Sequence, residues 1–475
     1  MKKTIITLLI VFLISGIIYA NFITGYFSID SEKITRLGYK EYAIQYSLYD
    51  GRIFMYIILM IANLFNTNLT TLYIVLFVIS LFIYSCSVLL LYNTINELKK
   101  EDRKIHKIIV FLLAYTYIFN FTTINNMEFI ECIIMSASVI LFIISAKKIV
   151  LKNKPIIGFV ICLTGILCYQ GTFNVFITTA IMFLALKKNE EQEKHYFIKK
   201  VVLIGLITLG VVILDIIVVK TLQAFIESSQ GNRFELNIIE NIKSLIKGIP
   251  MVVCDSLKLF PKFLQLIIIT IITTLMYIYS IKNKKIKEFW MLILLIITCY
   301  LSCLALGITN SRLILETNGR MFNSTGALMS VILIYIYVKT DIFNKKYGTI
   351  LKTIIFIYFI ISLFNTFYIT KILKTDNILE KQISFKIKEE LEKNNINKVA
   401  IDYVIGVEGP GISKNKIVLC LYNTRIYKFY TGEELNKVWF DLDIRKEYFG
   451  DEKEKMIVVD DILYILFETD KYNYF

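Results

Sequence analysis

The sequence predicts a polytopic α-helical membrane protein that ends in a small α/β domain. Three observations lead to this prediction. Of the 475 residues, 56% are hydrophobic and only 19% are charged, which is too apolar for an ordinary soluble domain. Apolar runs of about 18 residues recur, and each could cross the hydrocarbon of a bilayer as a helix. From about residue 376 the composition changes to the alternating runs typical of strands.

The basic residues of the chain give it a formal net charge of +14. They are concentrated in short segments between the apolar runs, at residues 99–107, 147–154, 187–200, 282–288 and 339–348. Short basic loops of membrane proteins stay on the cytoplasmic side. This bias explains the charge, so we expect contact with membrane lipid and no nucleic-acid partner.

The first predicted helix covers residues 1–20 and begins with Lys2 and Lys3. A cleaved signal peptide ending at Ala20 is the alternative, but the apolar part is longer than a usual signal core. We therefore expect an uncleaved helix in the cell membrane with the N-terminus in the cytoplasm. This orientation places residues 28–52, expected as a polar loop, on the outer side.

The apolar piece at residues 53–66 is too short for a span, and we interpret it as an interfacial or re-entrant helix. Crossings follow at residues 69–92, 108–121, 127–146, 155–169, 172–186, 201–222, 260–281, 289–306, 324–339 and 349–371. With the first helix they make about 11 transmembrane helices and place every basic segment inside. The pairs around Phe121 and Gln170 are short, as expected for tight helical hairpins that point outward.

Residues 1–374 form the predicted transmembrane domain, and residues 375–475 form the predicted extracytoplasmic α/β domain. The second part begins with the amphipathic helix pattern "DNILEKQISFKIKEELEKNN". Alternating runs follow in the order "KVAIDYVI", "KIVLCLYN", "KMIVVDD" and "LYILFET". About 100 residues are enough for a domain with its own core.

On this topology, the polar residues of the apolar part gather on the outer side. They are Asp30, Glu32, Asp50, Arg52, Asn125, Asn126, Glu128, Glu131, Gln170, Asn174, Arg233, Asp255, Lys258, Arg312, Glu316 and Arg320. Each one alone also fits an ordinary polar loop. Because ionisable groups are costly at membrane depth, their convergence predicts a polar cavity that opens outward.

Carboxylates and arginines in one cavity suit displacement at a sugar carbon with a lipid phosphate as the leaving group. A carboxylate can deprotonate the acceptor hydroxyl, and arginines can stabilise the departing phosphate. The sequence lacks nucleotide-binding and protease motifs, and His106 and His195 lie in predicted cytoplasmic segments. Eight cysteines without a CxxC pair indicate neither a zinc site nor a disulfide framework.

Several short motifs occur in an order that resembles one family. After the first helix come acidic residues, an arginine, Gly38-Tyr39, several aromatics and "DGR" at residues 50–52. Further on are "CYQGTFNVFI" at residues 168–177, "NGRMFN" at residues 318–323 and the amphipathic helix after the last span. This order is similar to that of the bacterial membrane glucosyltransferases of the Gtr type II family, known from O-antigen glucosylation.

The resemblance implies a GT-C fold that transfers a hexose, glucose in that family, from a polyprenyl-phosphate donor to a cell-surface glycan. It implies that Asp30 is the general base and Glu32 a second acid. Donor or phosphate binding then falls to Arg52, Gln170, Arg312 and Arg320, and the substrate loop includes Asp50 and Glu128. The resemblance leaves Gln170 to bind sugar or phosphate, and Arg52 to bind phosphate or order the loop. The family has two adjacent acids where this chain has Asp30 and Ser31.

Three structural explanations stay open beside these roles. Residues 50–52 also fit a simple turn with Arg52 as an anchor, and Gln170 also fits a hairpin that it closes through backbone contacts. Arg312 and Arg320 could instead pair with Glu316 or with lipid headgroups.

The implied functional partners are a cytoplasmic glycosyltransferase that loads the lipid and a small flippase. The sequence indicates no cofactor, and its carboxylates are compatible with a divalent cation. Two other classes stay open. One is a polysaccharide polymerase, flippase or other transporter of lipid-linked sugars, for which inverted repeats and broken helices are expected but not indicated. The other is a non-enzymatic scaffold whose external domain binds a partner.

Overall fold

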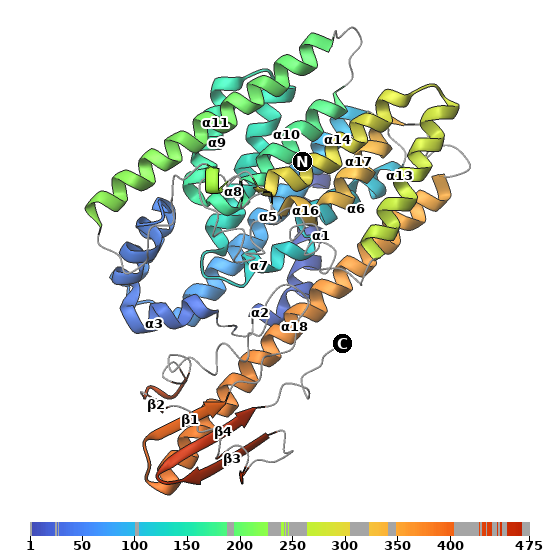
Figure 1. Cartoon of the computed structure of the whole chain (residues 1–475). Helices are drawn as coiled ribbons and strands as arrows, with labels where there is room; N and C mark the ends of the chain where they lie inside the picture. Colours follow the sequence, from blue (N-terminus) through green and yellow to red (C-terminus); the bar gives the residue numbers. More distant parts are fainter. Residues whose placement is uncertain are drawn as a thin grey trace.

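The computed structural model describes most of the chain. The described residues are 2–23, 26, 28–99, 104–187, 194–226, 239–241, 243, 246, 264–304, 323–340, 348–402, 427, 430–433, 435–438, 444, 447–448 and 454–467. Among them, a bundle of apolar helices is joined through one long helix to a small β-sheet (Figure 1).

The helices follow the predicted apolar runs closely. In the first half they are α1 (Lys2–Ile18), α2 (Ala20–Ile23), α3 (Ile29–Tyr42), the π-helical turn η1 (Ala43–Leu48), α4 (Ile53–Leu64), α5 (Leu69–Lys99), α6 (Lys104–Ile118), η2 (Phe121–Thr123), α7 (Ile124–Met127), α8 (Cys132–Ala146), η3 (Lys147–Leu151), α9 (Pro155–Cys168), η4 (Gln170–Thr172) and α10 (Asn174–Leu186). The second half contains α11 (Lys194–Phe225), α13 (Leu264–Lys282), α14 (Ile286–Leu304), α16 (Asn323–Gly326), α17 (Leu328–Lys339) and α18 (Gly348–Asn394).

The described helices fall into two length classes. Five are long and apolar enough to cross a membrane, namely Leu69–Lys99, Cys132–Leu151, Tyr196–Phe225, Ile286–Cys303 and Gly348–Thr375. The shorter apolar helices are Thr4–Ile18, Ile53–Leu64, His106–Ile118, Pro155–Cys168, Gln170–Leu186, Leu266–Lys282 and Leu328–Lys339. This composition is that of a helical membrane protein, and the expectation that residues 53–66 are too short for a span is consistent with the length of α4.

The helices are arranged with two of the shorter ones at the centre. Nearly every residue of α10 and α17 is buried. By contrast, α11, α13, α14 and α18 expose large apolar side chains such as Leu206, Ile267, Trp290 and Phe364. An apolar outer surface around a packed interior is what a protein surrounded by lipid requires.

The expectation of a loop over residues 28–52 is wrong, because α3 and η1 cover most of it. Ser28 is the N-cap of α3, and Ser31 Oγ accepts a hydrogen bond from the Ser28 backbone N–H at 3.2 Å. This reciprocal arrangement is a capping box, which starts a helix even in a polar stretch. Gly38, at φ 79° and ψ 163°, then interrupts the helix, which explains why no single helical pattern is visible in the sequence.

The last predicted span and the amphipathic segment after it form one helix, so the expectation of a separate helix from residue 376 is wrong. α18 runs for 47 residues without a break. Its final third packs against the sheet, where Ile383 and Ile387 join Val399 and Ile465 in one apolar core. A continuous helix therefore connects the bundle to the sheet (Figure 1).

The sheet has four strands in the order β2-β1-β4-β3. β1 (Lys398–Asp402) is parallel to both β2 (Asn436–Val438) and β4 (Ile462–Phe467), and β3 (Glu454–Val459) is antiparallel to β4. Three of the four predicted runs coincide with β1, β3 and β4 to within a residue at their starts. The fourth run, "KIVLCLYN", lies outside the described residues, and no run was predicted at β2. Asp460 and Asp461, both with positive φ, form the two-residue turn between β3 and β4.

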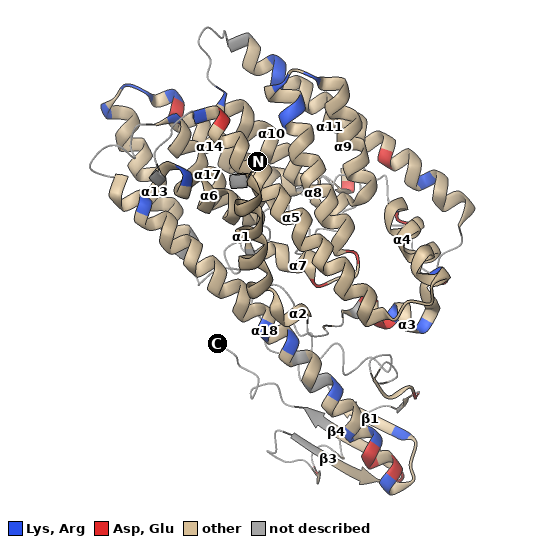
Figure 2. Cartoon of the chain, turned by 180° about the vertical axis from the view of Figure 1, so that it is seen from behind, with Lys and Arg blue, Asp and Glu red and all other residues tan. Residues whose placement is uncertain are grey.

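The described parts of the basic segments lie at one end of the bundle (Figure 2). The Lys339 ammonium donates to the Lys187 carbonyl at 2.9 Å, and Lys187 donates to the Val150 carbonyl at 3.4 Å. Lys147 pairs with Glu97 at 3.1 Å. Two of these contacts place a cation on carbonyls at or near helix C-termini, where a positive charge is favourable. We call this end, with residues 97–99, 147–154, 187, 282–288 and 339, the basic end.

Candidate functional site

A polar network lies at the opposite end of the short helices. It consists of Asp50, Arg52, Glu131, Tyr169, Gln170 and Asp215. α8 starts directly after Glu131 and leads to Lys147, and α9 starts directly after Lys154 and leads to Tyr169. Since about 14 residues of helix rise roughly 21 Å, the network and the basic end are separated by about that distance.

Arg52 is the centre of the network. Its Nη1 lies 2.8 Å and 2.7 Å from the two carboxylate oxygens of Glu131, and its Nη2 lies 3.3 Å from Oδ2 of Asp50. The guanidinium also lies over the ring of Tyr169, 5.2 Å from its centroid. Glu131 is fully buried. Arg52 therefore joins the starts of α4 and α8 to the turn after α9 through a buried ion pair.

The turn at residues 50–52 is docked on α11 and on Gln170. Gln170 Nε2 donates to the Asp50 carbonyl at 2.9 Å and to Oδ1 of Asp215 at 3.3 Å. Gly51 has φ 77°, and a Cβ atom there would lie 2.6 Å from Cγ2 of Val219. The turn thus requires glycine for two reasons, its backbone conformation and the close approach of α11.

Asp30 and Glu32, the predicted catalytic acids, are both buried in the first turn of α3. Oδ1 of Asp30 pairs with Lys33 at 2.9 Å, and Oε1 of Glu32 pairs with Arg36 at 3.4 Å. Acidic groups in a first helical turn are also favoured by the helix dipole, so their position has a structural explanation as well.

The start of α3 is tied to the corner that precedes α8. The Tyr26 hydroxyl donates to Oε2 of Glu128 at 3.2 Å, and both side chains are buried. Glu128 and Glu131 occupy the same corner, three residues apart. The chain segment that carries Asp30 and Glu32 is therefore tied to the corner that holds Glu128 and Glu131.

At the other end of α3, the Tyr39 hydroxyl donates to the Thr67 carbonyl at 2.9 Å, and burial raises the pKa of the Tyr39 phenol.

Beside the acidic corner lies a cluster of buried amides and hydroxyls. Asn126 Nδ2 donates to Oδ1 of Asn323 at 3.1 Å and to the Tyr84 hydroxyl at 3.2 Å. Ser324 Oγ donates to Oδ1 of Asn174 at 3.0 Å. These bonds connect the corner before α8, the start of α10 and the start of α16.

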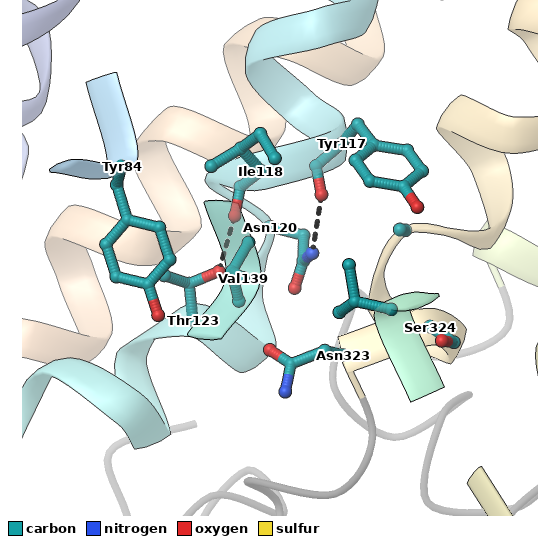
Figure 3. A pocket seen from close by; sticks show the side chains of 10 residues that line it. Tyr84, Tyr117, Ile118, Asn120, Thr123, Val139, Asn323 and Ser324 are labelled. Atoms are coloured by element: carbon teal, nitrogen blue, oxygen red, sulfur yellow. Dashed lines mark hydrogen bonds between the residues drawn. The ribbon is translucent and has the colours of Figure 1, made fainter. Parts of the chain in front are cut away.

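A small cavity lies within this cluster (Figure 3). Polar side chains of Tyr84, Asn120, Thr123 and Asn323 line it together with apolar groups. Two of these side chains bond to carbonyls at the end of α6. Asn120 donates to the Tyr117 carbonyl at 3.0 Å, and Thr123 donates to the Ile118 carbonyl at 2.6 Å. The space for a water centre is about 10 Å³, which is on the order of one water molecule.

The structure thus places the predicted site residues as follows. Asp50 contacts both Arg52, through its carboxylate, and Gln170, through its backbone carbonyl. Asp30, Glu32 and Glu128 lie on adjoining segments. Arg312 and Arg320 lie outside the described residues. In the described part of the chain, no three His, Cys, Asp or Glu side chains are grouped as metal ligands would be.

Three residues of the network were not predicted as site residues: Glu131, Tyr169 and Asp215. Glu131 was expected only as one of the polar residues that gather on the outer side. Asp215 offered a clear signal, because it is a single acid within the apolar run at residues 201–222, and ionisable groups there are costly. Tyr169 precedes Gln170 in the motif "CYQGTFNVFI", in which only Gln170 was given a role. Comparisons of the chain with known protein families, with characterised proteins and with solved structures find no match.

Proposed function

We propose that the chain is a membrane glycosyltransferase that transfers a hexose from a polyprenyl-phosphate donor to a cell-surface glycan. One observation carries this proposal. Buried carboxylates lie on the segments around Arg52, opposite the basic end: two of them pair with its guanidinium, and a third accepts a hydrogen bond from Tyr26, just before the helix that carries the other two. These carboxylates are Asp30, Glu32, Asp50, Glu128 and Glu131.

The depth of the network supports a lipid-linked substrate. With the basic end at the cytoplasmic surface, α6, α9 and α10 have 15, 14 and 13 residues and rise about 20–22 Å. The hydrocarbon core is about 30 Å thick, so their far ends lie roughly 8–10 Å below the outer surface. Polar side chains at that depth are within reach of a phosphate that is anchored in the membrane by a lipid tail. In the proposed topology about 11 helices cross, and residues 375–475 form the external domain.

In the proposed reaction, Asp30 accepts the proton of the acceptor hydroxyl as its oxygen attacks the anomeric carbon. The bond to the phosphate oxygen breaks, the phosphate leaves with the electron pair, and the configuration inverts. Glu32 is the second acid. Arg312 and Arg320 stabilise the departing phosphate, and Arg320 stands three residues before Asn323, which contacts Asn126.

Arg52 is assigned to ordering the loop. Its two carboxylate partners offset its charge, which supports this role over phosphate binding. Glucose as the hexose follows from the resemblance to the Gtr type II family. So do a cytoplasmic glycosyltransferase that loads the lipid and a small flippase as functional partners.

A transporter of lipid-linked sugars is the second candidate, and one observation favours it. The turns at residues 119–131 and 169–173 end short helices below the proposed outer surface, and helices that stop within the membrane are common where transporters bind substrate.

One experiment tests both candidates. The purified chain in vesicles receives a radiolabelled polyprenyl-phosphate hexose and acceptor glycan, and label is followed into the glycan and across the membrane. We expect transfer by the wild type and a loss of at least about 100-fold in Asp30→Asn. Glu97→Gln, an exposed acid at the basic end, is the control and should retain transfer. Transport of label without transfer would favour the second candidate instead.

A further inference from the structure

The side-chain amide of Gln170 has a fixed orientation. Its Nε2 lies 2.9 Å from the Asp50 carbonyl oxygen and 3.3 Å from Oδ1 of Asp215. A backbone carbonyl can only accept a hydrogen bond, so the NH2 group must point toward Asp50. The flipped amide would place two oxygens against each other. Both N–H groups of Gln170 are therefore used within the protein.

The other end of the amide, Oε1, is left as an accessible acceptor. In the part of the chain that the structure describes, the side chain of Gln170 makes hydrogen bonds only through Nε2. Oε1 is not among the buried polar atoms without a partner, and the residue is half-buried, so this oxygen can be reached from outside. An amide oxygen accepts hydrogen bonds from hydroxyl groups but has no proton to give to a phosphate oxygen.

Asp215 and the turn at residues 50–52 together hold this acceptor in place. Asp215 is buried within the membrane-spanning helix α11, where a carboxyl is costly unless it has a partner. Gly51, with φ 77°, shapes the turn in which the Asp50 carbonyl faces Gln170. The amide is thus fixed from two elements, α11 and the start of α4.

We propose that Gln170 Oε1 accepts a hydrogen bond from one hydroxyl of the hexose on the lipid donor, and that Asp215 is the positioning residue for this contact. The inference rests on the proposed function and narrows it. Gln170 then recognises the sugar and contributes nothing to the binding of the phosphate.

The test measures binding, so that it does not depend on catalysis. The full chain in lipid nanodiscs is titrated with polyprenyl phosphate, with polyprenyl-phosphate hexose and with a series of donors that each lack one hydroxyl. Wild type is compared with Gln170→Met, Asp215→Asn and the double variant. The control is Thr221→Val, also on α11, whose hydroxyl bonds only the Ile217 carbonyl of its own helix at 2.7 Å.

We expect the wild type and Thr221→Val to bind polyprenyl-phosphate hexose about tenfold more tightly than one of the donors that lack a single hydroxyl. Gln170→Met should bind these two donors equally. Asp215→Asn should reduce the difference, and adding it to Gln170→Met should change nothing further. All variants should bind polyprenyl phosphate equally.

Three results separate the inference from the proposed function. The inference is overturned if Gln170→Met keeps the wild-type preference among the donors. It is also overturned if this variant loses as much affinity for polyprenyl phosphate as for the hexose donor. If the wild type binds the hexose donor no better than polyprenyl phosphate, both are overturned. If the preference depends on Gln170 but no transfer occurs, the inference stands and the proposed reaction does not.

Discussion

Arg52 and Glu131, which are 79 residues apart in the chain, are joined by hydrogen bonds of 2.8 and 2.7 Å from one guanidinium nitrogen to both carboxylate oxygens. Glu131 is fully buried, and the Arg52 side chain is only 14% exposed. An ion pair of this kind is weak evidence of net stabilisation, but breaking it leaves a charge buried without its partner. The pair therefore fixes how the turn at residues 50–52 meets the corner before α8.

The first prediction concerns this pair. Arg52→Gln should destabilise the protein by about 3–5 kcal/mol, because it leaves the Glu131 carboxylate without its cation. The double variant Arg52→Gln/Glu131→Gln should be more stable than Arg52→Gln alone. Thermal unfolding in detergent measures both. Lys147→Gln, which breaks an exposed pair with Glu97 at the basic end, is the control and should cost less than about 1 kcal/mol. Additive effects of the two substitutions would contradict the proposed coupling.

The second prediction concerns Gly51. Gly51→Ala should cost about 2–4 kcal/mol, because alanine is strained at φ 77° and its Cβ would collide with Val219. Val219→Ala removes the collision but leaves the backbone strain, so the double variant should recover part of the loss. Gly16→Ala, where the added Cβ meets nothing, serves as the control. A Gly51→Ala protein as stable as the Gly16→Ala protein would rule out the close approach.

The third prediction concerns Ser31, where the chain departs from the family pattern. Ser31→Ala removes the acceptor for the Ser28 backbone N–H and should destabilise α3 by about 1 kcal/mol. Ser31→Glu supplies another side-chain acceptor at the same helix position and should restore the stability. Hydrogen exchange of the α3 amides reports the difference directly. Equal exchange in all three proteins would show that Ser31 has no capping role.

Parts of the fold could be predicted from sequence because local pattern decides them. Apolar run lengths locate the helices, and the lysine segments indicate which helix ends meet, as the contact of Lys339 with Lys187 illustrates. Ser31 carries the same kind of local information, because a serine three residues after Ser28 fits a capping box. The continuity of α18 was missed because the change of composition near residue 376 was interpreted as a boundary between helices.

The candidate site depends on tertiary contacts that no local pattern specifies. Nothing near Arg52 in the sequence indicates that Glu131 is its partner, since the pairing depends on how α4 and α8 pack. Gln170 was predicted as a binding residue, but only the position of the Asp50 carbonyl shows which end of its amide is available. The orientation of a polar side chain is set by its neighbours in space, and these are known only from the folded chain.

The fourth prediction is the topology. If the basic end is cytoplasmic, a cysteine placed there must be reached from the cytoplasm and one near the sheet from outside. Lys152, in the connection between α8 and α9, and Lys393, at the end of α18, are both exposed. With a membrane-impermeant maleimide on intact cells, Lys393→Cys should be labelled, and Lys152→Cys only after the membrane is opened. The wild type is the control for the native thiols, of which Cys132, Cys162 and Cys299 are buried. The proposal requires seven crossings between the two new cysteines. Labelling of both from the same side would mean an even number instead. Either the polar network or the sheet would then lie on the cytoplasmic side.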